Sequence, residues 1–155
     1  YDMWLPGNQS INTFTGFLKP DPEITLTIPS ATDKAISVGA YDTSTDKVAS
    51  FSGRGFTREN NQIKPDIVAP GVNIRSAATG GGTTVLSGTS MATPFVTGSA
   101  ALMMEWGIVR GNDPYLYGEK IKAYLIRGAK HLPGYEQWPN KQAGWGALCL
   151  RDSLV

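Results

Sequence analysis

Ser90 lies in the stretch Ser87-Gly88-Thr89-Ser90-Met91-Ala92-Thr93-Pro94, where a small, polar turn leads into an expected helix. A hydroxyl at such a junction projects from the turn, and the free N–H groups of the helix's first turn point at whatever it attacks. This is the arrangement of a nucleophile beside an oxyanion-binding site. Serine and threonine are also ordinary helix N-caps, so the short string alone permits a purely structural interpretation.

A serine nucleophile needs a base, and in a catalytic triad the base is a histidine oriented by an aspartate. The sequence holds one histidine, His131, just before Leu132-Pro133-Gly134, and we expect it in a surface loop. Asp66 lies within Lys64–Gly71, a stretch that we expect to form a strand. Three further aspartates lie near turns and have the character of caps, namely Asp33, Asp42 and Asp46. The residues therefore predict a nucleophile without a base in this chain.

The composition excludes several classes of function. With 41% apolar and 17% charged residues, the 155-residue chain is typical of a globular domain. Its net charge of +1 gives no support to nucleic-acid binding. No apolar run approaches the roughly 20 residues that a membrane span requires. Cys149 and the single histidine have no second ligand at a suitable spacing, so we expect neither a disulfide nor a metal, and no cofactor.

Strands and turns are expected before the serine. Short apolar strands are predicted at Ala35–Ala40 and Lys64–Gly71, and a hairpin pairs Val72–Ala77 with Thr83–Leu86 across three glycines. Residues 1–29 differ from the rest: turn signals at residues 5–8 and 19–22 and the alternation of residues 24–28 predict edge strands and loops, hence a β-rich segment.

Helices are expected after the serine. The main helix runs from Ser90 to about Trp106 and is apolar nearly all round, which predicts a central, buried element. Asn112-Asp113-Pro114 is expected to cap a second helix that ends at Gly128. Gly144–Leu148 predicts a tight turn into a short last element. Strands that alternate with helices predict an α/β fold.

The longer string Gly88-Thr89-Ser90-x-Ala92-x-Pro94-x-x-Thr97-Gly98 resembles the serine signature of the subtilase (subtilisin-like) serine proteases. Other segments resemble further motifs of that family in the same order, namely Val38-Gly39-Ala40, Phe51-Ser52-Gly53-Arg54-Gly55, Lys64–Gly71 and Gly144–Leu148. The resemblance implies that residues 30–155 are the C-terminal half of a catalytic domain. Its fold would be the subtilisin-like three-layer α/β fold with a mostly parallel sheet.

By this resemblance Ser90 is the catalytic nucleophile of a serine endopeptidase and forms an acyl-enzyme. Its N–H would donate to the oxyanion, Thr89 and Gly88 would support that site, and Thr83–Ser87 would line the approach. Phe95 stands where the family commonly has a histidine, which is not the catalytic base, so this departure bears on packing.

The resemblance also implies a structural role for Asp66 in the Lys64–Gly71 strand. The family's Asp-Ser/Thr-Gly and His-Gly-Thr segments are not present in the sequence. The family's side-chain oxyanion donor would also precede this region; Gly7-Asn8 fits it superficially, but its flanks suit a hairpin turn better. We therefore expect the C-terminal part of a longer protease, inactive by itself, with the missing N-terminal part and a protein or peptide substrate as partners. A pseudoprotease that serves as a receptor or scaffold is the alternative, and a self-standing binding module is a third hypothesis.

Within the family, residues 51–56, 94–98 and 106–108 resemble the Csp-type subtilases of spore-forming clostridia, some of which act in spore germination. This narrower resemblance implies a secreted or spore-associated bacterial protein. Residues 1–29 would then correspond to the tail of an inserted β-domain that some Csp-type members carry before the serine segment.

Overall fold

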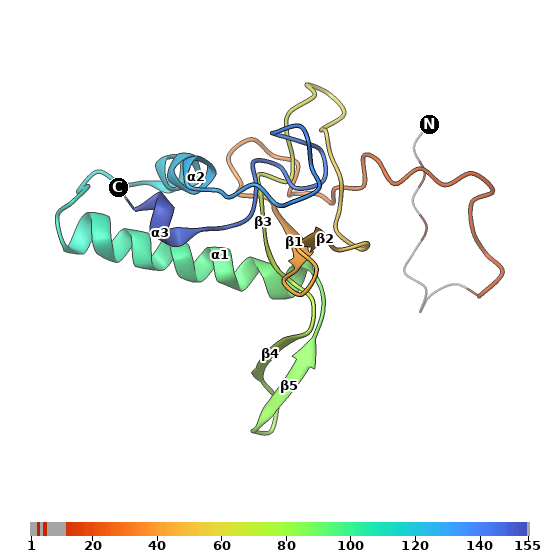
Figure 1. Cartoon of the computed structure of the whole chain (residues 1–155), viewed down its shortest axis with the longest axis horizontal. Helices are drawn as coiled ribbons and strands as arrows, with labels where there is room; N and C mark the ends of the chain where they lie inside the picture. Colours follow the sequence, from red (N-terminus) through yellow and green to blue (C-terminus); the bar gives the residue numbers. More distant parts are fainter. Residues whose placement is uncertain (1–2, 4, 6–11, 155) are drawn as a thin grey trace.

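A three-stranded sheet forms the centre of the fold in the computed structural model, which describes residues 3, 5 and 12–154 (Figure 1). Its middle strand, β1 (Val38–Asp42), runs parallel to β3 (Ile67–Pro70) and antiparallel to the short β2 (Lys47–Val48). Both apolar strands predicted from the sequence are present. With its helices, the sheet gives the α/β architecture that the sequence predicts.

The two faces of the sheet carry different packing, because successive side chains of a strand point to opposite sides. On one face the small residues of β1 and β3 pack against helix α1 (Thr89–Met104), and helix α2 (Gly118–Arg127) joins the same core. Val68 points to the other face, into a second cluster with Leu132, Ala143 and Ala147. Small side chains at the sheet surface allow α1 to lie close to it.

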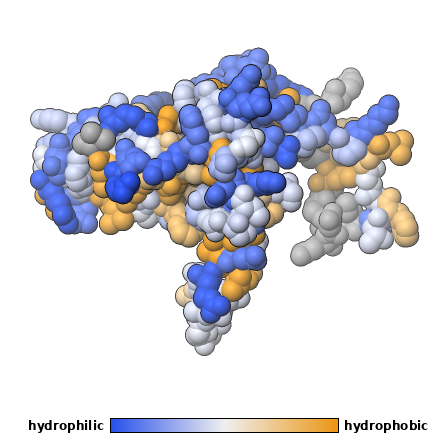
Figure 2. All heavy atoms as spheres, in the orientation of Figure 1, coloured by the Kyte–Doolittle hydropathy of each residue, from blue (hydrophilic) through white to orange (hydrophobic). Residues whose placement is uncertain are grey.

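The expectation that the main helix is buried all round is wrong. The residues of α1 that are buried lie on one face, namely Ala92, Val96, Ser99 and Met103. Phe95, Leu102 and Met104 are 42%, 52% and 46% exposed, and Figure 2 shows apolar residues at the surface over α1. The sheet covers one side of the helix, and the described chain supplies no layer for the other.

Both helices differ from the prediction at one end. Helix α1 gives way at Glu105 to a π-helical turn, η1 (Glu105–Val109). Helix α2 begins at Gly118, later than the predicted cap, because the carboxylate of Asp113 instead binds Lys120 and the hydroxyl of Tyr124. It ends at Gly128 as predicted.

The predicted hairpin is present, formed by β4 (Ile74–Ala77) and β5 (Thr83–Leu86). Gly80, Gly81 and Gly82 all have positive φ, a conformation that glycine adopts without steric cost. The hairpin projects from the body of the molecule (Figure 1).

The β-rich character expected of residues 1–29 is not found where the structure describes them. Residues 12–29 form turns and irregular chain, and Ile24, with φ of 54°, interrupts the alternating segment. Thr25 instead bonds the loop after β2: its N–H donates to the Arg54 carbonyl, and its hydroxyl accepts the Arg54 N–H. The Gly7-Asn8 turn lies outside the described residues. The short last element is α3 (Leu150–Ser153), which follows the Gly144–Gly146 turn.

Candidate active site

Ser90 is the second residue of α1, and its side chain is exposed. The carbonyl of Gly88, the residue before the helix, accepts the N–H groups of Met91 and Ala92 at 3.0 and 3.3 Å. The N–H groups of Thr89 and Ser90 find no acceptor within the part of the chain that the structure describes. Two free donors beside an exposed hydroxyl can bind an oxygen that gains negative charge when the hydroxyl attacks a carbonyl.

The turn before Ser90 is fixed by contacts with the end of β3. The Gly88 N–H donates to the Gly71 carbonyl at 2.8 Å, and the Ser87 hydroxyl accepts the Asn73 N–H at 2.8 Å. A Cβ on Gly71 would lie 2.9 Å from the Gly88 carbonyl oxygen and 2.5 Å from the Ala40 side chain. Gly71 is therefore required for the close approach that places the serine turn against the sheet.

Ser90 lines a hollow of about 320 Å³ between the base of the hairpin and the first turns of α1. Its walls come from one strand and one helix face, namely Ile74, Arg75, Ser76, Met91, Pro94 and Phe95. The strand wall is β4. The residues expected to line the approach, Thr83–Ser87, do not line this hollow, and Thr83–Leu86 pair with β4 as β5. Sequence reasoning missed Arg75, since the hairpin pattern does not specify which strand faces the helix.

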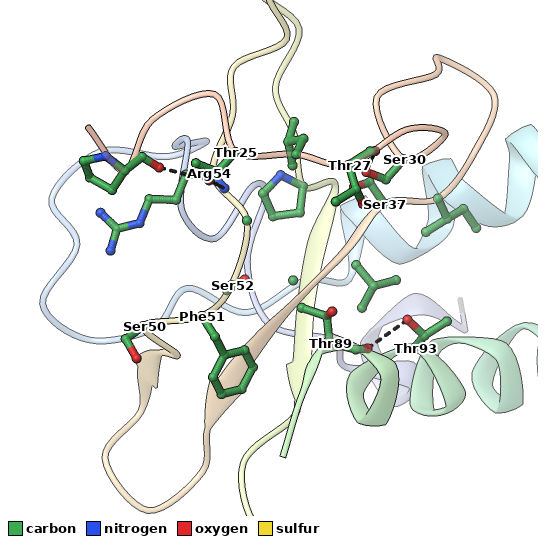
Figure 3. Close-up of a pocket in the computed structure, with 17 residues that line it drawn as sticks. Thr25, Thr27, Ser30, Ser37, Ser50, Phe51, Ser52, Arg54, Thr89 and Thr93 are labelled. Carbon is green, nitrogen blue, oxygen red and sulfur yellow. Dashed lines mark hydrogen bonds between the residues drawn. The ribbon is translucent and has the colours of Figure 1, made fainter. Parts of the chain in front are cut away.

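Thr89 lies on a second, larger hollow of about 510 Å³ on the other side of the turn. Figure 3 shows it with Thr93 of α1, facing β1 and the loop that carries Phe51 and Ser52. The Thr93 hydroxyl donates to the Thr89 carbonyl at 3.0 Å. The side chains of Thr89 and Ser90 therefore line different hollows, and the unbonded backbone N–H is the group of Thr89 that remains for the supporting role expected of it.

His131 lies on the opposite face of the sheet from α1. Its ring stacks on Trp138, with 4.4 Å between ring centroids, and Trp138 packs against the cluster that contains Val68. The structure thus does not bring His131 and Ser90 together, which agrees with the expectation of a loop histidine.

Asp66 is buried and fully engaged. Its carboxylate accepts Lys64 Nζ and Lys122 Nζ, both at 2.8 Å, and the Ser37 N–H at 2.7 Å. Burial lowers the pKa of Lys64, and the hydrogen bond and charge of Asp66 oppose that shift. These contacts tie the start of β1, the start of β3 and α2 together, so Asp66 has the structural role expected of it.

The other aspartates serve turns and helix contacts. The carboxylate of Asp42 accepts the N–H and the hydroxyl of Ser44, and these bonds lower the pKa of Asp42. Asp46 adopts a positive φ in the following turn.

Across residues 3, 5 and 12–154 no three histidine, cysteine or acidic side chains gather as a metal site. Of the helices in those residues, none has the length and apolarity to cross a membrane.

Comparison with known proteins identifies the family. The model described as "Subtilase family" matches residues 6–146. The chain belongs to the subtilase family. Serine protease AprX of Bacillus subtilis is 37% identical over 158 aligned residues, covering 87% of this chain and 33% of AprX. The human membrane-bound transcription factor site-1 protease is 34% identical over 131 residues, or 81% of this chain and 12% of that protein.

Solved structures agree with this subtilase assignment. The structure of the Clostridium perfringens CspB protease is similar with a TM-score of 0.85 and 50% identity, over 90% of this chain and 30% of that one. The prenylagaramide maturation protease PagA is similar with a TM-score of 0.70 and 33% identity, over 86% of this chain and 46% of that one. This subtilase chain thus spans 33% or less of the length of these two curated relatives.

Proposed function

We propose that this subtilase chain supplies the nucleophile of a serine endopeptidase and that Ser90 forms the acyl-enzyme. The observation that carries the proposal is the exposed Ser90 hydroxyl beside the free N–H groups of Thr89 and Ser90, within the family's serine signature. The hydroxyl oxygen would bond to the peptide carbonyl carbon while a base takes its proton. The carbonyl oxygen, now negative, would accept the Ser90 N–H, with the Thr89 N–H and the Gly88 turn in support.

Collapse of this tetrahedral intermediate would break the carbon–nitrogen bond, and the base would return its proton to the departing amine. Water would then cleave the ester on Ser90 by the same route in reverse, releasing the second product. Protein or peptide substrates follow from the family and from this chemistry.

We further propose that the base and its aspartate come from a preceding segment of a longer protein, which makes residues 30–155 the C-terminal part of the catalytic domain. The relatives are several times longer than the matched region, and His131 lies across the sheet from Ser90. By itself the chain would then lack the base.

An open edge of the sheet supports this completion. β3 pairs with one edge of β1 from Val38 to Tyr41, and β2 pairs with the other edge at Tyr41 and Asp42. On that second edge the Ala40 carbonyl accepts the Ala49 N–H, and the Ala40 N–H donates to the Ser52 hydroxyl. At the start of β1, no strand within the described residues pairs with Val38 on that side, and Val38 lines the larger hollow. A further strand laid in this hollow would satisfy the edge and lie beside Thr89.

The test is labelling of the protein that includes the preceding segment with a fluorophosphonate, which reacts with an activated serine. We expect one label on Ser90, and loss of both label and peptide cleavage in Ser90→Ala. Ser76→Ala is the matched control, because it removes another exposed hydroxyl from the same hollow and should keep the label.

The isolated 155 residues should show a rate lower by about 10⁶-fold, since the base is missing. Ser90-dependent proteolysis by this chain alone would overturn the proposed division of the triad. Failure of the longer protein to label would instead favour the scaffold or receptor hypothesis.

A further inference from the structure

Among the described residues that line the hollow at Ser90, Arg75 of β4 is the charged one. We propose that Arg75 selects peptide substrates with an aspartate or glutamate directly beside the bond to be cleaved. This inference rests on the proposed endopeptidase function and adds the class of substrate that the site accepts.

The charge of Arg75 is not neutralised by the described protein. No ion pair or hydrogen bond joins the Arg75 guanidinium to another described residue, and no acidic residue lines the hollow. By contrast, Arg110 and Arg151 each bind a carboxylate close by in the sequence, on Glu105 and Asp152. Arg75 is thus free to bind a carboxylate that enters the hollow.

The walls of the hollow favour that interaction. Besides Arg75, the two serines and the backbone, they consist of apolar side chains, namely Ile74, Met91, Pro94 and Phe95. Apolar walls exclude water and strengthen the attraction between a guanidinium and a carboxylate. The planar guanidinium can also donate two parallel hydrogen bonds to the two oxygens of one carboxylate. The amide of a glutamine in the peptide has one oxygen and cannot accept such a pair.

The position of Arg75 relative to Ser90 defines which substrate residue it meets. Both side chains line the same hollow of about 320 Å³, which accommodates one side chain. A peptide whose carbonyl carbon contacts Ser90 carries its next Cα atoms about 3.8 Å apart along the chain. The residue that reaches this hollow is therefore one that flanks the cleaved bond.

The strand that carries Arg75 is held in place. Arg75 lies within β4 and pairs in register with Val85 of β5, away from the glycine tip. At the base of the hairpin, the Asn73 N–H and the Ser87 hydroxyl are joined at 2.8 Å. The guanidinium is consequently presented from a paired strand, as a specificity group requires.

The experiment measures kcat/KM of the protein that includes the preceding segment on peptides with glutamate, glutamine or lysine at each position flanking the cleaved bond. At low ionic strength we expect glutamate to be preferred over glutamine by roughly five- to tenfold at one position, the range expected of a partly shielded charged hydrogen bond. Arg75→Gln should remove this preference, and Arg75→Glu should transfer it to lysine.

Arg54→Gln is the matched control, since Arg54 lines the larger hollow and not that of Ser90, and the glutamate preference should persist. Equal cleavage of the glutamate and glutamine peptides, or a preference unchanged in Arg75→Gln, would overturn the inference while fluorophosphonate labelling of Ser90 still upholds the protease. Absence of wild-type labelling would overturn both proposals.

Discussion

The exposure of Ser90 depends on glycines that carry no chemistry themselves. Gly88 caps α1 with its carbonyl, and Gly71 lets the end of β3 approach that turn closely. Ser90 is thus positioned by backbone contacts between two segments, while its own hydroxyl has no partner to hold it within the described residues. Pro70-Gly71, which ends the Lys64–Gly71 segment, is as much a part of the site's geometry as the serine signature.

The first prediction concerns Gly71→Ala. The added methyl group would meet the Ala40 side chain and the Gly88 carbonyl, so the serine turn has to move away from β3. We expect the free energy of unfolding to fall by about 1–3 kcal/mol, the usual cost of overpacking, and the rate of fluorophosphonate labelling at Ser90 to fall with it. Urea unfolding of this chain measures the first effect, and timed labelling of the protein that includes the preceding segment measures the second.

Gly98→Ala is the control for Gly71→Ala. Gly98 lies on the exposed face of the same helix as Ser90, and a Cβ there has no neighbour within 4 Å. In the isolated chain, this replacement of a helical glycine by alanine should stabilise the protein by up to about 1 kcal/mol. Equal losses in both variants would show that the close approach of Gly71 does not position the turn.

At the scale of elements, the sequence predicts whether a segment is a helix or a strand better than it predicts which of its faces other parts of the chain cover. The apolar runs at 35–40 and 64–71 and the triple glycine at 80–82 predict β1, β3 and the hairpin, because strand patterning and positive φ are local properties. The main helix is also predicted nearly to the residue, but its burial is not. Periodicity reports which faces are apolar and not whether the rest of the chain covers them.

The second helix shows that a helix start is also hard to predict from the sequence. Asn112-Asp113-Pro114 has the composition of a helix start, yet α2 begins at Gly118. The Asp113 carboxylate binds Lys120 Nζ and the Tyr124 hydroxyl, and Leu116 turns into the core between them. Contacts with side chains 7 and 11 residues further along the chain have replaced the local cap, and no short pattern encodes that choice. The same holds for Ile24–Ile28, where contacts with the Arg54 loop replace a strand.

This replacement predicts a pH dependence for the packing of α2. The Lys120 hydrogen bond is the main cause that lowers the pKa of Asp113, and Asp113 in turn raises the pKa of Lys120. A carboxyl whose folded pKa lies below its unfolded pKa stabilises the fold above the unfolded value, about 3.9. That contribution is lost as the pH falls through the folded pKa. The Lys120 contribution is lost only as the pH rises through its raised pKa.

Asp113→Asn should therefore lower the melting temperature between about pH 4 and pH 10, and the difference from the wild type should vanish in stronger acid. Thermal unfolding followed across this range gives the test. Glu136→Gln is the control, because Glu136 is exposed in a loop and its change should have little effect. A deficit that persists unchanged at pH 2 would mean that Asp113 acts through packing and not through its charge.

At the scale of the whole molecule, the described residues leave two stretches of surface near the serine turn without a covering layer or strand. Apolar side chains lie exposed along α1 and η1, including Leu102, Met104 and Val109, the last 78% exposed. The open edge of β1 and the larger hollow lie beside the first turn of the same helix. Two kinds of unsatisfied surface, one apolar and one hydrogen-bonding, thus border the serine turn, where the proposed remainder of the catalytic domain would have to supply the base.

The last prediction tests whether that remainder covers α1, through Leu102→Gln. In the isolated chain, Leu102 is 52% exposed, so the polar substitution should reduce self-association and the binding of an apolar dye. In the longer protein the same leucine would be buried, and the substitution should lower the free energy of unfolding by about 1–3 kcal/mol, since it buries an amide in place of a hydrocarbon group. Sedimentation of the isolated chain and urea unfolding of the longer protein measure the opposite effects. Leu18→Gln is the matched control, because Leu18 is fully exposed and belongs to residues 12–20, a stretch that runs apart from α1 in Figure 1, and it should change stability little in either form. If Leu102→Gln is harmless in the longer protein, the exposed face of α1 is solvent-facing there as well, and the remainder must dock elsewhere.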